Sequence, residues 1–241
     1  MAGHIKKTIL KHKHESTIKE KNVAKRKCTR SKDESTPCSV NSSMKRSVKR
    51  KDNGVFAFND HPKFQPNLSP KEVLQSGSFG GTYFRPIKSG VTKMSYGSEV
   101  WKELPEDWLK GLDITKQVAS PNYDMNVNKY KVKCGGSLQM WEDSNWIRAQ
   151  DPYGWFQWYC RFFQGRRSED DGRQISRWLN CAGVNGRWRN NLIGKIYRAR
   201  ANYNDIQVSP VVRQVLLHWG YVLTEEDFKA RVDKLKIQGK K

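Results

Sequence analysis

Long apolar runs are missing from this sequence. No stretch approaches the ~18 consecutive apolar residues of a membrane-spanning helix, and the mean hydropathy is strongly negative. Residues 1–20 also lack the apolar segment of a secretory signal. We therefore expect neither a membrane protein nor a membrane partner.

Aromatic residues are absent from the first 54 positions, although the 241-residue chain has 27 of them. The same segment contains 16 basic and five acidic residues. Such a composition cannot bury enough apolar area to offset the entropy lost on ordering. The sequence therefore predicts a disordered, lysine-rich arm over 1–54, a globular domain over 55–238 and a basic tail over 239–241.

Acidic residues are few: 24 Asp and Glu stand against 45 Lys and Arg, a net charge of +21. The arm carries +11 of this, so the remaining residues still carry +10 and favour a polyanionic partner. Two basic clusters in the arm are typical of nuclear-localisation signals or nucleic-acid patches, with a solvated tail as the alternative. They comprise Lys25, Arg26, Lys27 and Arg30, and Lys45, Arg46, Lys49, Arg50 and Lys51.

Cysteine is scarce and its spacing is uninformative. The five cysteines form no CxxC pair, and an odd number argues against a disulfide framework. This fits a reducing, intracellular compartment such as the nucleus. Folding could gather Cys134, Cys160, Cys181 and His218 around zinc, but their spacing does not indicate it. We predict no metal and no cofactor.

The domain is expected to be mainly α-helical, a single compact unit of short helices with a small strand and turn region. Ser69 to Glu72 has the pattern of a capping box, and the glycines of 77–86 indicate a tight turn with a short strand. Further helices are predicted from Ser137 to about Ile147, and over 151–165 with Asp151 as N-cap. A helical hairpin is predicted over 209–236.

The helix predicted over 151–165 has seven aromatic residues in eleven positions. Rings on all sides indicate a central core helix. The alternative is that some rings are exposed and stack on nucleic-acid bases. The candidates for that role are Trp155, Trp158 and Tyr159.

Arginine replaces lysine as the main basic residue between 161 and 200, with nine Arg and one Lys. The planar guanidinium forms bidentate contacts with phosphate and guanine. Two successive amphipathic helices, each with a basic face, are therefore predicted to line one nucleic-acid groove, with solvated faces as the alternative. The predicted contact residues are Arg161, Arg166, Arg167, Arg173, Arg177, Arg187, Arg189, Lys195 and Arg198.

Four distinctive segments lie within residues 64–230: SPKEVLQSGSFGGTYFRP, CGGSLQMWE, DPYGWFQWYCRFFQGRRSEDDGRQISRW and SPVVRQVLLHWGYVLTEEDF. Together they resemble a Trp-rich protein family of eukaryotes and large DNA viruses for which no activity is established. The resemblance implies one domain over 56–238 and assigns no catalytic residue.

The leading functional prediction is a nucleic-acid-binding protein that uses the arginine-rich face and the arm. The alternative is an enzyme acting on nucleic acid, with Asp151, Asp170 and Asp171 in its site. The consecutive acids Glu169, Asp170 and Asp171 also have a simple structural reason, because they lie at a predicted helix start, where the helix dipole favours acidic side chains. The third possibility is a module that binds a peptide in an aromatic groove.

Overall fold

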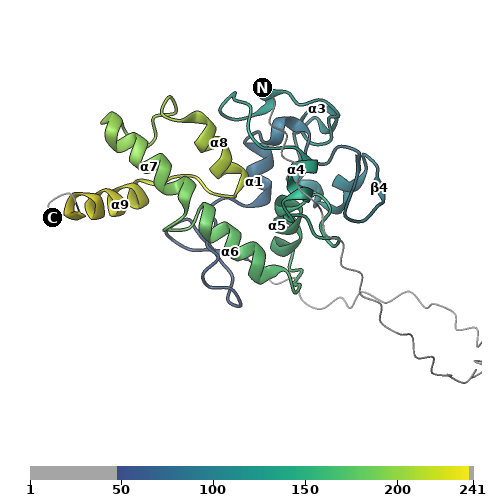
Figure 1. Cartoon of the computed structure of the whole chain (residues 1–241), viewed down its shortest axis with the longest axis horizontal. Coiled ribbons are helices and arrows are strands. Elements are labelled where there is room, and N and C mark those ends of the chain that lie inside the picture. Colours follow the sequence, from purple (N-terminus) through teal and green to yellow (C-terminus); the bar gives the residue numbers. More distant parts are fainter. Residues whose placement is uncertain (1–47, 239–241) are drawn as a thin grey trace, which may run out of the picture. The chain divides into compact units, whose positions relative to one another are not determined.

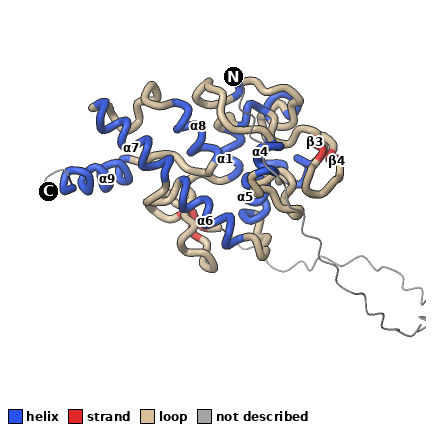
Figure 2. The backbone as a smooth tube through the Cα atoms, viewed as in Figure 1, coloured by secondary structure: helices blue, strands red, loops and turns tan. Residues whose placement is uncertain are grey.

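A computed structural model of the chain describes residues 48–238, which belong to one unit, and the fold is mainly helical as predicted (Figure 1). The described part contains nine α-helices: α1 (Pro70–Gln75), α2 (Glu106–Leu109), α3 (Ile114–Gln117), α4 (Leu138–Asp143), α5 (Trp155–Phe163), α6 (Asp171–Cys181), α7 (Arg187–Ala199), α8 (Pro210–His218) and α9 (Glu225–Gln238). It also contains the 3-10 turns Phe79–Gly81, Val100–Glu103 and Met125–Val127. Loops connect these short elements over much of the chain (Figure 2).

Strands are limited to two antiparallel pairs in the described residues. β1 (Lys49–Arg50) pairs with β2 (Phe56–Ala57), and β3 (Ile87–Lys88) pairs with β4 (Ser95–Tyr96). The strand predicted within 77–86 therefore forms just after that segment. The glycines instead support the 3-10 turn Phe79–Gly81.

The boundary predicted between arm and domain at 54/55 is wrong, because β1 belongs to the fold. The Arg50 guanidinium lies 4.3 Å from the centre of the Phe56 ring and 2.5 Å from a Glu72 carboxylate oxygen. Lys49, Arg50 and Lys51 are thus part of a packed hairpin rather than of a disordered signal. The other predicted signal residues, Lys25, Arg26, Lys27, Arg30, Lys45 and Arg46, and the tail 239–241, lie outside the described residues.

α5 is the central helix, but it begins later than predicted. Its N-cap is Gly154, whose φ of +83° favours glycine, and a Cβ there would lie 2.7 Å from the Ile147 side chain. Asp151 is not the N-cap, because its carboxylate is bound by arginines instead. The helix ends at Phe163, just before Gly165 (φ +102°), as predicted.

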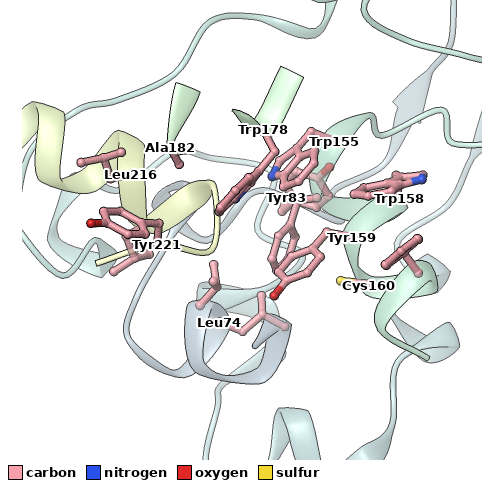
Figure 3. Close-up of a cluster of buried hydrophobic side chains, with 14 of the residues drawn as sticks. Leu74, Tyr83, Trp155, Trp158, Tyr159, Cys160, Trp178, Ala182, Leu216 and Tyr221 are labelled. Atoms are coloured by element: carbon pink, nitrogen blue, oxygen red, sulfur yellow. The ribbon is translucent and has the colours of Figure 1, made fainter. Parts of the chain in front are cut away.

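The core is a cluster of rings around Phe64, which is fully buried. Its ring packs edge-on against Trp155 and Tyr159 of α5 and against Trp178 of α6, at 5.2 to 6.1 Å between centres. Figure 3 shows the rings of α5 and α6 in one cluster with Leu216 and Tyr221 from the C-terminal part. Rings from both halves of the sequence thus form one hydrophobic core.

Hydrogen bonds join the segment before α1 to the segment between α8 and α9. The Asn67 side chain donates to the carbonyl of Val222 and accepts from its N–H, both at 2.8 Å, and Leu68 N–H donates to the Gly220 carbonyl. α8 and α9 both pack on α7. The prediction of a helical hairpin over 209–236 is therefore wrong, because α8 and α9 pack on α7 rather than on each other, although both helices serve packing as the sequence indicated.

Candidate functional site

The predicted arginine face does not form one surface, because carboxylates neutralise much of it. Arg161 and Arg166 both bind the fully buried Asp151, at 3.0 and 2.6 Å, and Arg161 also pairs with Glu103 at 2.5 Å. This network ties the turn before α5 to the C-terminal end of that helix, because Arg161 lies in its last turn and Arg166 follows it. These two arginines have a structural role.

Three further arginines are paired in the same way. Arg173 forms a bidentate contact with Asp170, one turn away on α6. Arg167 binds Asp60 at 2.6 Å while its guanidinium lies 3.8 Å from the Phe162 ring centre. Arg189 is buried and pairs with Asp227 of α9 at 2.5 Å.

The three carboxylates considered as acid or base groups are held in this framework. Asp171 accepts hydrogen bonds from Trp158 Nε1 and from the Ser168 hydroxyl, both at 2.8 Å. Ser168 and Asp171 thus form a cap-like pair at the start of α6, and Glu169 is exposed. Asp151, Asp170 and Asp171 are all buried, and none lines the cavity described below.

The rings proposed for base stacking are also structural. Trp158 and Tyr159 are fully buried, and the Tyr159 hydroxyl donates to the Leu68 carbonyl. Trp155 is 9% exposed and its Nε1 donates to the His218 carbonyl. The prediction of base stacking is wrong for Trp158 and Tyr159, because the core surrounds both rings. Trp155 alone reaches the wall of a cavity.

A cavity of about 650 Å³ lies between the loops around α4 and the helices α5 to α8. Ten Phe, Tyr or Trp side chains and three arginines line it, but no aspartate or glutamate does. The aromatic residues are Phe79, Tyr83, Tyr123, Trp141, Trp146, Tyr153, Trp155, Phe156, Trp188 and Trp219, and the arginines are Arg85, Arg177 and Arg187. A largely apolar cleft or cavity with a few convergent polar groups is the usual form of a ligand site.

Arg177 is the most distinctive cation of this cavity. Its guanidinium lies 5.3 Å from the Trp146 ring centre and 5.5 Å from that of Trp219. Its nearest hydrogen-bond partners are neutral: Gln174 Oε1 at 2.9 Å and the Trp146 carbonyl at 3.4 Å. Desolvation, together with the neighbouring Arg173, lowers the pKa of Arg177 to about 10, so the group stays charged at neutral pH.

Arg187 supplies a second, exposed guanidinium at the start of α7. It lies 5.0 Å from the centre of the neighbouring Trp188 ring. From there a row of exposed residues continues along α7, through Asn191, Lys195 and Arg198, at helical spacing. Lys195 reaches the Ser209 hydroxyl at 3.1 Å. In this row the predicted contact residues Arg187, Lys195 and Arg198 do share one face.

Half-exposed rings at the cavity were not identified as candidate contacts from the sequence. Trp146 is 39% exposed and Tyr123 is 37% exposed. Trp188 and Trp219 are each only partly buried, and both line the cavity. No sequence signal identified Trp146, because the helix was predicted to run to about Ile147, whereas α4 ends at Asp143 and Asn145 (φ +56°) precedes Trp146 outside the helix.

Two glycines allow the loops to close over this space. A Cβ on Gly80 (φ +57°) would lie 2.6 Å from atoms of the Tyr123 ring, and one on Gly81 (φ +78°) would lie 2.0 Å from the Lys116 carbonyl oxygen. The glycine-rich segment thus serves close chain packing, in agreement with its interpretation as a structural turn.

A thiol and an imidazole meet at the cavity wall. Cys134 Sγ lies 3.8 Å from His218 Nδ1, while His218 Nε2 accepts a hydrogen bond from the Phe79 N–H at 2.9 Å. Burial lowers the pKa of His218 to about 3 and raises the pKa of Cys134 to about 11. Both groups are therefore neutral near pH 7, so the pair lacks the thiolate that nucleophilic catalysis requires.

The remaining cysteines do not complete a metal site. Cys160 and Cys181 are buried free thiols, and Cys181 lines the same cavity as Cys134. No group of three or more His, Cys, Asp or Glu side chains suited to a metal occurs among residues 48–238.

Comparison with protein families, curated proteins and solved structures found no match. Across the described residues, every helix is too short or too polar to cross a membrane.

Proposed function

We propose that this protein binds nucleic acid, and that the contact surface consists of the cavity mouth and the exposed row on α7. The observation that carries this proposal is the composition of the cavity: ten aromatic side chains and three arginines without a carboxylate. We call this surface, with Arg177, Arg187, Lys195 and Arg198, the cationic surface.

The chemistry of the cationic surface suits a strand with bases and phosphates. Proteins that bind single strands combine cationic grooves for the backbone with aromatic rings for the bases. Here the Arg187 guanidinium lies beside Trp188, so a phosphate and a base have adjacent partners. The paired arginines, by contrast, have their charge neutralised within the protein and contribute less to phosphate binding.

Paired variants test this proposal in the full-length protein. Arg187→Gln with Arg198→Gln removes two exposed cations of the cationic surface, neither of which has a carboxylate partner among the described residues. We expect the affinity for a fluorescent single-stranded oligonucleotide to fall roughly 5- to 25-fold at 0.1 M salt, and the log–log salt slope by about 1.4, since each lost contact removes ~0.7. Fluorescence anisotropy at several salt concentrations measures both.

The matched control removes the same charge elsewhere. Lys63 and Lys110 are exposed and have no carboxylate partner within the described part of the chain, and neither lines the cavity. Lys63→Gln with Lys110→Gln should leave affinity within about twofold of the wild-type value if the contact is local. Equal losses in both double variants, or wild-type binding that ignores salt, would reject the proposed surface.

A further inference from the structure

We propose that the aromatic cavity receives a single unstacked base of a bound strand, while Arg177 contacts the phosphate attached to it. This inference rests on the proposed function and names the occupant of the same site. The occupant is a nucleotide unit, a planar ring that carries a negative charge.

The dimensions of the cavity fit such a unit. Its volume of about 650 Å³ falls within the ~300–1,000 Å³ of sites that enclose ligands of drug size. A base with its sugar and phosphate is of that size. A duplex is too wide to enter, so its bases would have to leave the stack first.

The walls offer rings to a flat ligand. Trp155 and Trp219 already pack on each other, with centres 4.4 Å apart and planes 32° apart, so indoles are held in fixed positions at the back. Trp146 and Trp188 are partly exposed at the cavity and keep ring surface free for a further partner. Rings held by packing lose little entropy when a base stacks on them.

The charge inside the cavity indicates an anion. Arg177 is partly buried beside two indoles, and its hydrogen-bond partners are a neutral amide and a carbonyl oxygen. A partly desolvated guanidinium without a hydrogen-bonded carboxylate is well placed to accept a counter-charge from a ligand. The phosphate of a nucleotide provides it in bidentate form.

The exposed row on α7 favours a nucleotide within a strand over a free one. Arg187 lies at the cavity, and the row through Lys195 to Arg198 spans 11 helical steps, or ~16 Å at 1.5 Å per residue. Phosphates that follow the inserted nucleotide would meet these cations in turn. A free mononucleotide would use Arg177 and leave the row empty.

The test compares two strands of equal charge on the unmodified, full-length protein. One is a 12-nucleotide single strand of thymidine, and the other is the same sugar–phosphate chain without bases. We expect the strand with bases to bind at least fivefold more tightly, because stacking on aromatic side chains contributes ~1–3 kcal/mol per base. Free thymidine monophosphate should compete only at far higher concentration.

A variant then localises the effect. Trp146→Leu removes a partly exposed ring but keeps an apolar side chain, and should weaken binding of the thymidine strand about fivefold while leaving the base-free strand unchanged. Trp101→Leu is the control, because Trp101 is also partly buried but does not line the cavity. It should change neither affinity.

The outcomes separate the two proposals. Equal, salt-dependent binding of both strands overturns the inserted base and leaves nucleic-acid binding intact. If the Trp146→Leu variant keeps the wild-type ratio between the affinities for the two strands, the inserted base is likewise overturned and nucleic-acid binding is left intact. Tighter binding of the free mononucleotide than of the strand overturns the strand as occupant. Absence of binding to any strand at low salt overturns the proposed function itself.

Discussion

Arg166 and Arg177 stand eleven positions apart in one arginine-rich segment, yet their surroundings give them opposite roles. Arg166 forms two hydrogen bonds to the buried Asp151 carboxylate. Arg177 has indoles and neutral oxygens around it. What distinguishes them is the residue that the fold brings near each guanidinium, and Asp60, which neutralises Arg167, is 107 positions away in the sequence. Local composition therefore predicted the cations but not which of them stay free.

His218 gives a prediction at the same scale, because its burial lowers its pKa from 6.5 to about 3. Between these values the unfolded chain binds a proton that the native imidazole does not, so stability falls as the pH falls below 6.5. From pH 7.5 to 5.5 we expect His218 to reduce the free energy of unfolding by about 1.3 kcal/mol. Urea unfolding at the two pH values measures the loss.

The variant His218→Gln keeps a hydrogen-bonding side chain but does not titrate, so its loss over this interval should be smaller by that amount. His61→Gln is the control, because His61 is only partly buried and makes no hydrogen bond to the cavity wall. A wild-type loss that persists in full in His218→Gln would show that the native imidazole is protonated.

At the scale of elements, local signals predicted where most helices end and some of the starts. The Ser69–Glu72 capping box forms as expected, with both of its hydrogen bonds present. The start of α5 was misjudged because Asp151 and Pro152 form a regular start signal, whereas Arg161 and Arg166 recruit the aspartate. α4 ends at Asp143 rather than near Ile147, and Asn145 (φ +56°) breaks the helical path there. Tertiary contacts therefore outweighed local propensity at the start of α5.

Asp151 tests this view of the α5 start. Asp151→Asn removes the charge shared by two arginines, and should lower the free energy of unfolding by about 2–3 kcal/mol. The expected loss is below the ~3–5 kcal/mol of fully buried pairs, because the Arg161 and Arg166 side chains each remain 27% exposed. A lower urea midpoint at an unchanged slope measures it.

The control for that loss is an exposed pair. Asp107 binds Lys71 at 3.0 Å, and its side chain is 64% exposed. Asp107→Asn should therefore cost less than ~1 kcal/mol. Similar midpoints for the two variants would mean that Asp151 does not anchor the turn before α5.

At the scale of the whole molecule, the net charge of +21 divides into parts with different properties. Composition predicted that division, because net charge and aromatic content are sums over many residues, and local capping and turn signals predicted the mainly helical fold. Neither composition nor local patterns predicted the cavity. Its lining residues come from segments between Phe79 and Trp219, and rings that look alike in sequence end up at the centre of the core or at the cavity.

This division leads to a prediction that compares the two sources of charge. Residues 1–54 carry a net charge of +11, and the Lys25, Arg26, Lys27 and Arg30 cluster is predicted to contact phosphates without base selectivity. Changing these four residues to Gln in the full chain should reduce the salt slope by up to ~2.8, at ~0.7 per contact. It should weaken binding of the thymidine strand and of the base-free strand by the same factor.

The Trp146→Leu variant should show the reverse pattern, an unchanged salt slope with a reduced ratio between the affinities for the two strands. If instead the arm substitutions alter that ratio, the arm takes part in base recognition, and the cavity is not its only source.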